Sequence, residues 1–349
     1  MTKRKKTILL LSGVLVLLIG ITVFLWAEFG TRAQLYSCTN YAMKTYVQQN
    51  VYGKNAKSAA AAAADRIGTL ENLITLQSED SDTSHLNAAA GATWTNIDSK
   101  TAKLLRTALS VAASSDGAYD PTILPVSALW DFGGDNQHVP GQSDIAKYLP
   151  YVNYRNLRVS SSEDSASLRD HYMALTLDAV GKGAACDEAA AAYKASGTDG
   201  GVVSVGTSVG VYGKKPGTSN WSIAVRDPAA TGQNAPALGE LSLSSGFVST
   251  VSTSENSFWK DGVLYFPLLN PKTGYPQNNG LISVTVVSPG GALSDALANA
   301  CFVLGREKSG PLLQKYNAQA IFVDSARHVF VTPALKKDFT VTGKYSLHP

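Results

Sequence analysis

The feature that most constrains this chain is an uninterrupted apolar run close to its N-terminus. Residues Thr7 to Trp26 contain no charged side chain and directly follow the basic cluster Lys3 to Lys6. About 20 apolar residues, at 1.5 Å each, are long enough to cross the hydrocarbon core of a bilayer. Positive charge ahead of the run favours a cytoplasmic N-terminus. The pattern therefore predicts a basic cytoplasmic tail (1–6), a transmembrane anchor (7–26), a connector (27–40) and an outward-facing domain (41–349).

A cleaved signal peptide, lipidated or not, is the alternative interpretation, because it also combines a basic start with an apolar core. The apolar run is long for a signal, and no small-x-small cleavage site follows it at once. We therefore favour an uncleaved anchor. We expect a single-pass protein of the plasma membrane whose domain lies outside the cytoplasm.

The rest of the chain has the composition of a packed domain with little net charge. Of the 349 residues 44% are hydrophobic, which is enough for a full-sized core. The net charge of +3 is concentrated in the N-terminal cluster, so no basic face indicates a nucleic-acid partner. The three cysteines are widely spaced and form no metal-ligand pattern.

Hydrophobic periodicity predicts helices interleaved with clustered strands. Helices are expected at 56–77, 98–115, 183–196 and 292–304, the last being the final helix. Strands are expected at 41–52 and 174–178, across 201–226 and 241–286, and lastly at 320–323. Residues 78–84 read as a loop. The fold class that fits is α+β, or a mixed α/β domain.

Several short blocks of glycine and polar residues stand out, although each one alone is ordinary turn chemistry. Gly181-Lys182-Gly183, ahead of the expected helix start, could hold a phosphate through free backbone N–H groups, but its spacing is not that of a P-loop. In chain order the blocks are Met43-Lys44-Thr45, Tyr119-Asp120-Pro121-Thr122, Trp130-Asp131-Phe132-Gly133, Lys182-Gly183 with Asp187, Gly206, Asn270-Pro271-Lys272-Thr273-Gly274 and Ser294-Asp295-Ala296-Leu297-Ala298.

From residue 41 to about residue 305, these blocks and their order resemble the ApbE-type flavin transferases, the FAD:protein FMN transferases. The resemblance implies an ApbE-like domain that binds FAD in a cleft, uses Mg²⁺ at the pyrophosphate, and moves FMN onto a Thr (or Ser) hydroxyl of an acceptor flavoprotein subunit. In such a transfer the pyrophosphate charge must be neutralised and the attacking hydroxyl deprotonated.

The resemblance also implies which residues form the site. Asp295 is the expected carboxylate ligand of Mg²⁺, which prefers oxygen ligands. The backbone carbonyls of Ala179 and Ala292 and the amide of Asn299 are the further metal ligands expected. The expected flavin-binding residues are Met43, Ala118, Tyr119, Asp120, Thr176, Lys182, Asp187 and Thr273.

Five positions depart from the family pattern. Pro267 stands where the family has the His expected to deprotonate the acceptor hydroxyl, so the catalytic base is unknown. His85, His138, Asp120 and Asp187 are substitute candidates, the carboxylates only if burial raises their pKa. The other departures are Asn299 for Thr, Thr176 for Asp, Glu255 for Gly and Gln77 for an aromatic residue.

Three functional hypotheses follow. The first is an enzyme that transfers FMN to an acceptor protein outside the cytoplasm. The second is a degenerate relative that binds or delivers FAD without transferring FMN. The third is a structural or interaction domain that binds no flavin. Retention of Asp295 favours the first hypothesis, and loss of the His favours the second.

Overall fold

The computed structural model describes residues 34–230 and 236–348. The predicted tail and anchor (1–26) and the start of the connector lie outside these residues. Among the described residues, no helix combines the length and apolar character needed to cross a membrane.

Seventeen strands and eight α-helices make up the described chain. The strands are β1 (Leu35–Ala42), β2 (Thr45–Tyr52), β3 (Thr95–Asn96), β4 (Leu157–Val159), β5 (Ser165–Leu168), β6 (Gly200–Val205), β7 (Ser208–Gly213), β8 (Trp221–Arg226), β9 (Ala237–Leu243), β10 (Gly246–Ser252), β11 (Phe258–Lys260), β12 (Val263–Tyr265), β13 (Leu281–Ser288), β14 (Gln319–Asp324), β15 (His328–Val331), β16 (Phe339–Val341) and β17 (Ser346–His348). The helices are α2 (Ala56–Ile74), α3 (Asp82–Ala88), α4 (Ser99–Ser114), α5 (Leu124–Trp130), α6 (Gln142–Tyr148), α7 (Asp178–Ala195), α8 (Gly291–Leu304) and α9 (Arg306–Lys315).

A nine-stranded sheet forms the centre of the fold, with strand order β1-β2-β6-β7-β10-β13-β14-β15-β17. Every pairing in this sheet is antiparallel except that of β15 with β17. Alternating burial along the strands gives the sheet two apolar faces, and each face is covered by a separate layer. The mixed α/β architecture expected from the sequence is therefore confirmed.

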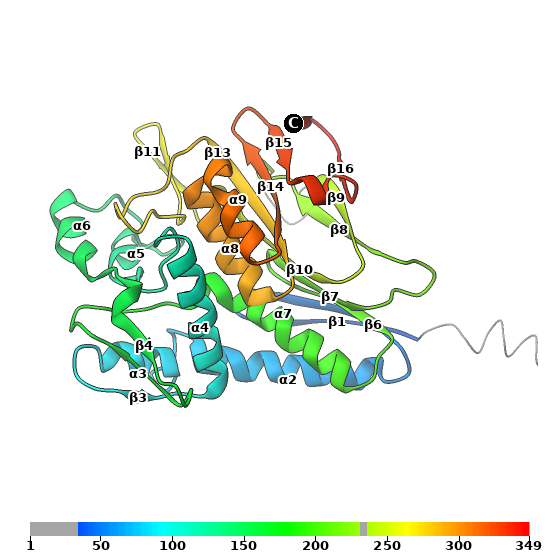
Figure 1. Cartoon of the computed structure of the whole chain (residues 1–349), viewed down its shortest axis with the longest axis horizontal. Coiled ribbons are helices and arrows are strands. Elements are labelled where there is room, and N and C mark those ends of the chain that lie inside the picture. Colours follow the sequence, from blue (N-terminus) through cyan, green and yellow to red (C-terminus); the bar gives the residue numbers. More distant parts are fainter. Residues whose placement is uncertain (1–33, 231–235, 349) are drawn as a thin grey trace, which may run out of the picture.

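Helices α2, α7 and α8 cover one face of the central sheet, with α4 and α9 packed outside them (Figure 1). On α2 the buried residues repeat at helical spacing, from Ala56 through Ala63 to Ile74, and the small alanines allow α7 to approach closely. The other face is covered by the three-stranded sheet β16-β9-β8, whose Trp221, Ile223 and Leu241 share a core with the central strands.

A smaller lobe holds α5, α6 and the β11–β12 hairpin (Figure 1). Its core is the fully buried Trp130, which stacks on Phe132 and donates a hydrogen bond from Nε1 to the Gly274 carbonyl at 3.0 Å. Two sequence blocks about 140 residues apart, the Trp130 and Asn270-to-Gly274 blocks, are thereby joined.

The structure corrects several expected elements. The strand expected at 41–52 is a hairpin of β1 and β2, so part of the predicted connector is an edge strand. The loop expected at 78–84 leads into helix α3, and 174–178 is not a strand, although Ala174 bridges to Ile123. The helix expected at 292–304 is not the last one, because α9 follows it and contains the Gly310-Pro311 pair without being interrupted. Three strands, β15 to β17, follow β14.

The structure also contradicts the prediction that Gly181-Lys182-Gly183 could form a phosphate-binding loop ahead of a helix. Helix α7 begins at Asp178, five residues before the expected start, so these residues lie inside its first two turns. Their N–H groups therefore do not form the exposed helix terminus that such a loop requires.

Candidate active site

A cleft of about 1140 Å³ opens where the β1–β2 turn, α2, α7 and the small lobe meet. It continues along the face of the central sheet that looks toward β8. Of the residues predicted from the sequence, Met43 and Lys182 line it, and so do Gln77 and Glu255, two of the departures from the family pattern.

Met43 and Lys44 form the turn of the β1–β2 hairpin, which projects into the cleft. Both have left-handed backbone angles, with φ of 53° and 58°, as the two central residues of a tight hairpin turn require. The Met43 N–H donates to Oε1 of Glu71 on α2 at 2.9 Å. This bond holds the turn against the helix and places the Met43 side chain on the cleft wall.

Lys182, Thr45 and Gly206 come from three distant segments and meet on the same wall. Gly206 has φ of 57°, and a Cβ there would lie 3.4 Å from both the Lys182 and Thr45 side chains. Three of the sequence blocks are therefore brought together on the cleft lining.

Asp295 lies directly behind this wall, buried on α8. Its Oδ2 accepts from the Gly183 N–H at 2.6 Å and its Oδ1 accepts from the Ser208 hydroxyl at 2.7 Å. Burial raises the pKa of Asp295, while these hydrogen bonds and the nearby Lys182 oppose the shift. Among the described residues, no ion pair neutralises this carboxylate.

Contact between α7 and α8 is what places Asp295 there. A Cβ on Gly183 would lie 2.0 Å from the Gly291 carbonyl oxygen, so only glycine permits the approach. Asp187, one turn further along α7, accepts from the Gly291 and Ala292 N–H groups at 2.7 and 2.9 Å. Asp187 thus caps the start of α8, and it does not line the cleft.

The other predicted metal ligands lie close to Asp295 in the chain or in space. Ala292 is in the first turn of α8, and Asn299 donates from Nδ2 to the Asp295 carbonyl at 3.0 Å. Ala179 is in the first turn of α7, four residues before Gly183. In the described chain, no three His, Cys, Asp or Glu side chains lie close enough together to bind a metal ion. A metal at this position would therefore be bound by the Asp295 carboxylate together with carbonyl and amide oxygens.

The block around Asp120 is buried beside this region and does not line the cleft. Asp120 accepts from the Thr122 N–H and hydroxyl through Oδ1 and from the Tyr154 N–H through Oδ2. Burial raises the pKa of Asp120, and those hydrogen bonds oppose the shift. Thr176 is joined to the same block, because its N–H donates to the Pro121 carbonyl at 2.9 Å.

Tyr119 carries a buried hydroxyl that has no hydrogen-bond partner among the described residues. Burial and the neighbouring charges of Asp120 and Asp295 raise its pKa. Ala118, next to it, is buried too. A buried hydroxyl without a partner is rare in native proteins, so the Tyr119 hydroxyl is a candidate to bind a polar ligand group.

Thr273 and Pro267 are both exposed and lie outside the cleft lining. The Thr273 hydroxyl accepts from the Tyr275 N–H at 3.3 Å, within a turn anchored by the 2.7 Å ion pair of Lys272 with Asp116.

None of the five histidines, all of which are described, lines the cleft, and His85 and His138 are exposed. The cleft carboxylates are Glu71, Asp131, Asp178, Asp227 and Glu255.

Some cleft residues had no sequence signal. Glu71 and Ser283 belong to no block, because their positions on the cleft lining arise from contacts made only after folding. A serine in a strand or a glutamate on a helix is otherwise an ordinary surface or core residue.

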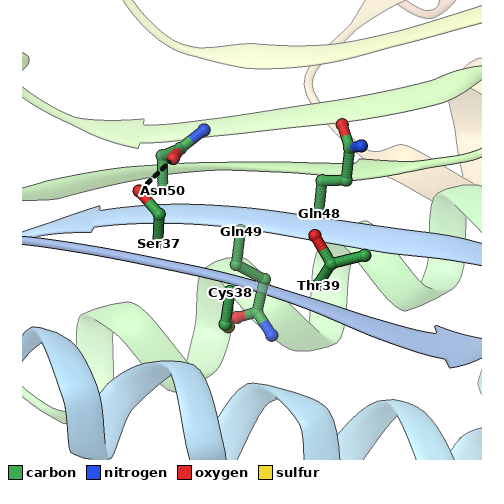
Figure 2. A pocket seen from close by; sticks show the side chains of 6 residues that line it. All are labelled: Ser37, Cys38, Thr39, Gln48, Gln49 and Asn50. Carbon is green, nitrogen blue, oxygen red and sulfur yellow. Dashed lines mark hydrogen bonds between the residues drawn. The ribbon is translucent and has the colours of Figure 1, made fainter.

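A second hollow of about 340 Å³ lies on the β1–β2 hairpin (Figure 2). Its residues point to both faces of the hairpin: Ser37 donates to Asn50 on one face, while Cys38 and Gln49 point toward the helices (Figure 2). Gln49 is fully engaged there, donating to the Ala60 carbonyl and accepting from the Tyr193 hydroxyl. The residues of this hollow therefore belong to the packing of the hairpin and do not form one ligand-binding site.

Together, the layered fold and the polar cleft with a buried carboxylate define a ligand-binding protein of the mixed α/β class. The ApbE family model matches residues 43–322. FAD:protein FMN transferase of Treponema pallidum is 30% identical over 328 residues, covering 87% of this chain and 90% of the relative. The enzyme of that name from Klebsiella pneumoniae is 26% identical, with 88% and 95% covered. This chain belongs to the ApbE family.

Solved structures agree with this assignment. The crystal structure of the ApbE protein from Thermotoga maritima matches with a TM-score of 0.80 at 27% identity, covering 87% of this chain and 99% of that one. The apo form of the flavinyl transferase ApbE from Pseudomonas stutzeri matches with a TM-score of 0.76 at 24% identity, covering 89% and 98%, which supports the fold alone.

Proposed function

We propose that this chain is an FAD:protein FMN transferase that uses Mg²⁺ and modifies a Thr (or Ser) hydroxyl of an acceptor flavoprotein subunit. The observation that carries the proposal is the Asp295 carboxylate, which has no ion-pair partner among the described residues and is buried behind the cleft wall formed by Lys182, Thr45 and Gly206. The relatives named above carry this activity in their names.

The residues present fit a magnesium ion. A buried carboxylate with a raised pKa gains most from a nearby cation. The Tyr119 hydroxyl, which has no hydrogen-bond partner among the described residues, would leave a polar group for a metal-bound water. Asp295 would hold the ion, with oxygens from Ala179, Ala292 and Asn299. When bound, the ion would neutralise charge on the pyrophosphate and so favour attack at phosphorus.

Side chains of the cleft would meet two further requirements, attraction of the pyrophosphate and deprotonation of the acceptor hydroxyl. Lys182, together with Lys44 and Arg226, brings positive charge to a cleft that also holds five carboxylates, so these side chains can attract the pyrophosphate. Glu255 is our candidate to accept the proton of the acceptor hydroxyl, because it lines the cleft, whereas Asp120 and Asp187 are engaged outside it.

The proposed location rests on the N-terminal sequence. Residues 7–26 would anchor the chain in the plasma membrane, and the domain would face acceptor proteins outside the cytoplasm.

One observation favours a second candidate function, FAD binding or delivery without transfer. Pro267 occupies the position of the family's His, and no histidine lines the cleft to replace it. A proline cannot take a proton, so this hypothesis requires that no cleft carboxylate serves as the base.

The test is a transfer assay with the full chain in mild detergent, FAD, Mg²⁺ and a flavoprotein acceptor, read as flavin fluorescence on the acceptor in a denaturing gel. We expect transfer by the wild type. Asp295→Asn should lower the rate by at least about 100-fold, since disturbing even the outer partners of a metal site costs 10- to 100-fold. The exposed Asp80→Asn variant is the matched control and should transfer normally. FAD binding by the wild type without transfer would establish the second function instead.

A further inference from the structure

Five lysines gather at the end of the domain where the chain enters β1. Lys54 precedes α2 and Lys57 lies in its first turn. Lys194 is in the last turn of α7, and Lys214 and Lys215 directly follow β7. Figure 1 shows the start of β1, the start of α2 and the end of α7 at the same end of the molecule. We call these five lysines the basic end.

Backbone hydrogen bonds join the turns that carry these lysines. The Gly53 N–H donates to the Gln34 carbonyl at 3.0 Å, and the Asp199 N–H donates to the Tyr52 carbonyl at 2.9 Å. The Lys214 N–H in turn donates to the Asp199 carbonyl at 2.9 Å. The turns after β2, after α7 and after β7 therefore lie side by side, next to the residue from which the chain enters β1.

The charge of the basic end is not balanced by its surroundings. Four of its lysines are exposed and Lys215 is half-buried, and none of the five forms an ion pair among the described residues. The turns that carry them, residues 53–57, 194–199 and 213–217, contain one carboxylate, that of Asp199. Without its N-terminal cluster the whole chain is close to neutral, so this surface is a local concentration of positive charge. Such a surface fits an anionic partner.

The predicted anchor indicates which anionic partner this is. If residues 7–26 span the membrane, the eight residues 27–34 connect the anchor to Leu35, and eight residues reach at most about 30 Å. The basic end is then tethered close to the lipid headgroups, which gives them a high effective concentration at this surface. Leu35, which is 50% exposed, adds an apolar side chain at the same end. A nucleic acid or an acidic protein would have no such tether.

We propose that the basic end binds the anionic lipid headgroups of the membrane that holds the anchor. This inference rests on the membrane location proposed above and does not depend on FMN transfer. Strand β1 is eight residues long, about 26 Å, and the Met43 turn follows at its far end. With the basic end on the headgroups, β1 separates the Met43 turn and the cleft that it lines from the lysines at the membrane.

The test measures how fast individual lysines of the full chain react with an amine-acetylating reagent, read by peptide mass spectrometry. The chain is held in lipid nanodiscs of phosphatidylcholine, with or without phosphatidylglycerol. Lys147 is the internal reference, because it is exposed on α6, at the opposite end of the molecule (Figure 1). Each basic residue at an anionic surface strengthens association about 5-fold, so the basic end should react at least about 5-fold more slowly with the anionic lipid, relative to Lys147. High salt should remove this protection.

A pair of double variants tests whether the charge is responsible. Lys54→Gln with Lys214→Gln removes two charges from the basic end, which should weaken its association about 25-fold and expose the three remaining lysines to the reagent. Lys103→Gln with Lys308→Gln is the matched control, because these two lysines are exposed on α4 and α9, away from the start of β1 (Figure 1). The control should keep the full protection.

Equal reaction rates in the two lipids would overturn the proposal, and so would an equal slowing of Lys147. Protection by added polyglutamate or by a DNA oligonucleotide, but not by phosphatidylglycerol, would assign the basic end to an acidic protein or a nucleic acid instead. If the chain entered the nanodiscs but its lysines were not protected, the proposed location would stand while this inference failed. If the chain did not enter them, both would fail.

Discussion

At the scale of single residues, the site is organised by buried carboxylates that have different partners. Asp187 is satisfied by the N–H groups of Gly291 and Ala292, and Asp120 by those of Thr122 and Tyr154. Asp295 also accepts hydrogen bonds, yet it alone lies directly behind the Lys182 wall of the cleft. We therefore expect Asp295 to take part in the reaction, and Asp187 and Asp120 to stabilise the fold.

Asp120 gives a prediction about pH. Because its pKa is raised in the folded protein above the ordinary value of 3.8, its stabilising contribution is complete below that value and is lost as pH rises through the folded pKa. Asp120→Asn does not titrate. The free energy of unfolding of the wild type minus that of the variant should therefore fall as pH rises from 4 to 8, by about 1.4 kcal/mol per unit of pKa shift.

Urea unfolding of both proteins across this pH range measures the difference. A difference that stayed constant, or grew with pH, would show that the hydrogen bonds lower the pKa of Asp120 at least as much as burial raises it.

At the scale of secondary-structure elements, the approach of α7 to α8 decides where Asp295, the proposed metal ligand, lies. Gly183→Ala would place a Cβ 2.0 Å from the Gly291 carbonyl oxygen and push the helices apart. We expect a loss of about 1–3 kcal/mol in stability, as for other overpacked cores, together with weaker Mg²⁺-dependent FAD binding. Chemical unfolding and calorimetry measure the two effects.

Gly68→Ala on α2 is the control, since a Cβ there meets nothing within 4 Å. It should stabilise the protein by about 0.5–1 kcal/mol, because alanine is the better helix former. Equal effects of the two substitutions would contradict the role given to the α7–α8 contact.

The elements also show how far the sequence could predict the structure. Helix α4 and the cores of α2 and α8 follow from strong periodicity, and Asp295 follows from its family block. The Met43-Lys44 turn could not be predicted, since non-glycine residues in left-handed conformations leave no local signal. Ser283 and Ser208 depend on contacts between distant strands and helices, which periodicity does not contain.

At the scale of the whole molecule, an N-terminal segment that the sequence predicts to be a membrane anchor precedes the described domain. If residues 7–26 anchor the chain, the full-length protein should sediment with membranes and resist extraction by high salt and carbonate, and a chain lacking residues 1–26 should be released. Protease added outside intact cells or spheroplasts should digest the domain. Protection of the domain would contradict the outward orientation.

The central claim is that this protein forms a covalent bond between FMN and an acceptor, despite Pro267. The most direct measurement is the intact mass of an acceptor protein after incubation with the full chain, FAD and Mg²⁺, with AMP measured in the same sample. We predict that the acceptor gains the mass of one FMN less one water, with one AMP released for each FMN added. Substituting the acceptor's modified Thr or Ser by Ala should abolish the gain. An acceptor of unchanged mass, in samples where the chain binds FAD, would contradict the claim and leave a flavin-binding protein without transferase activity.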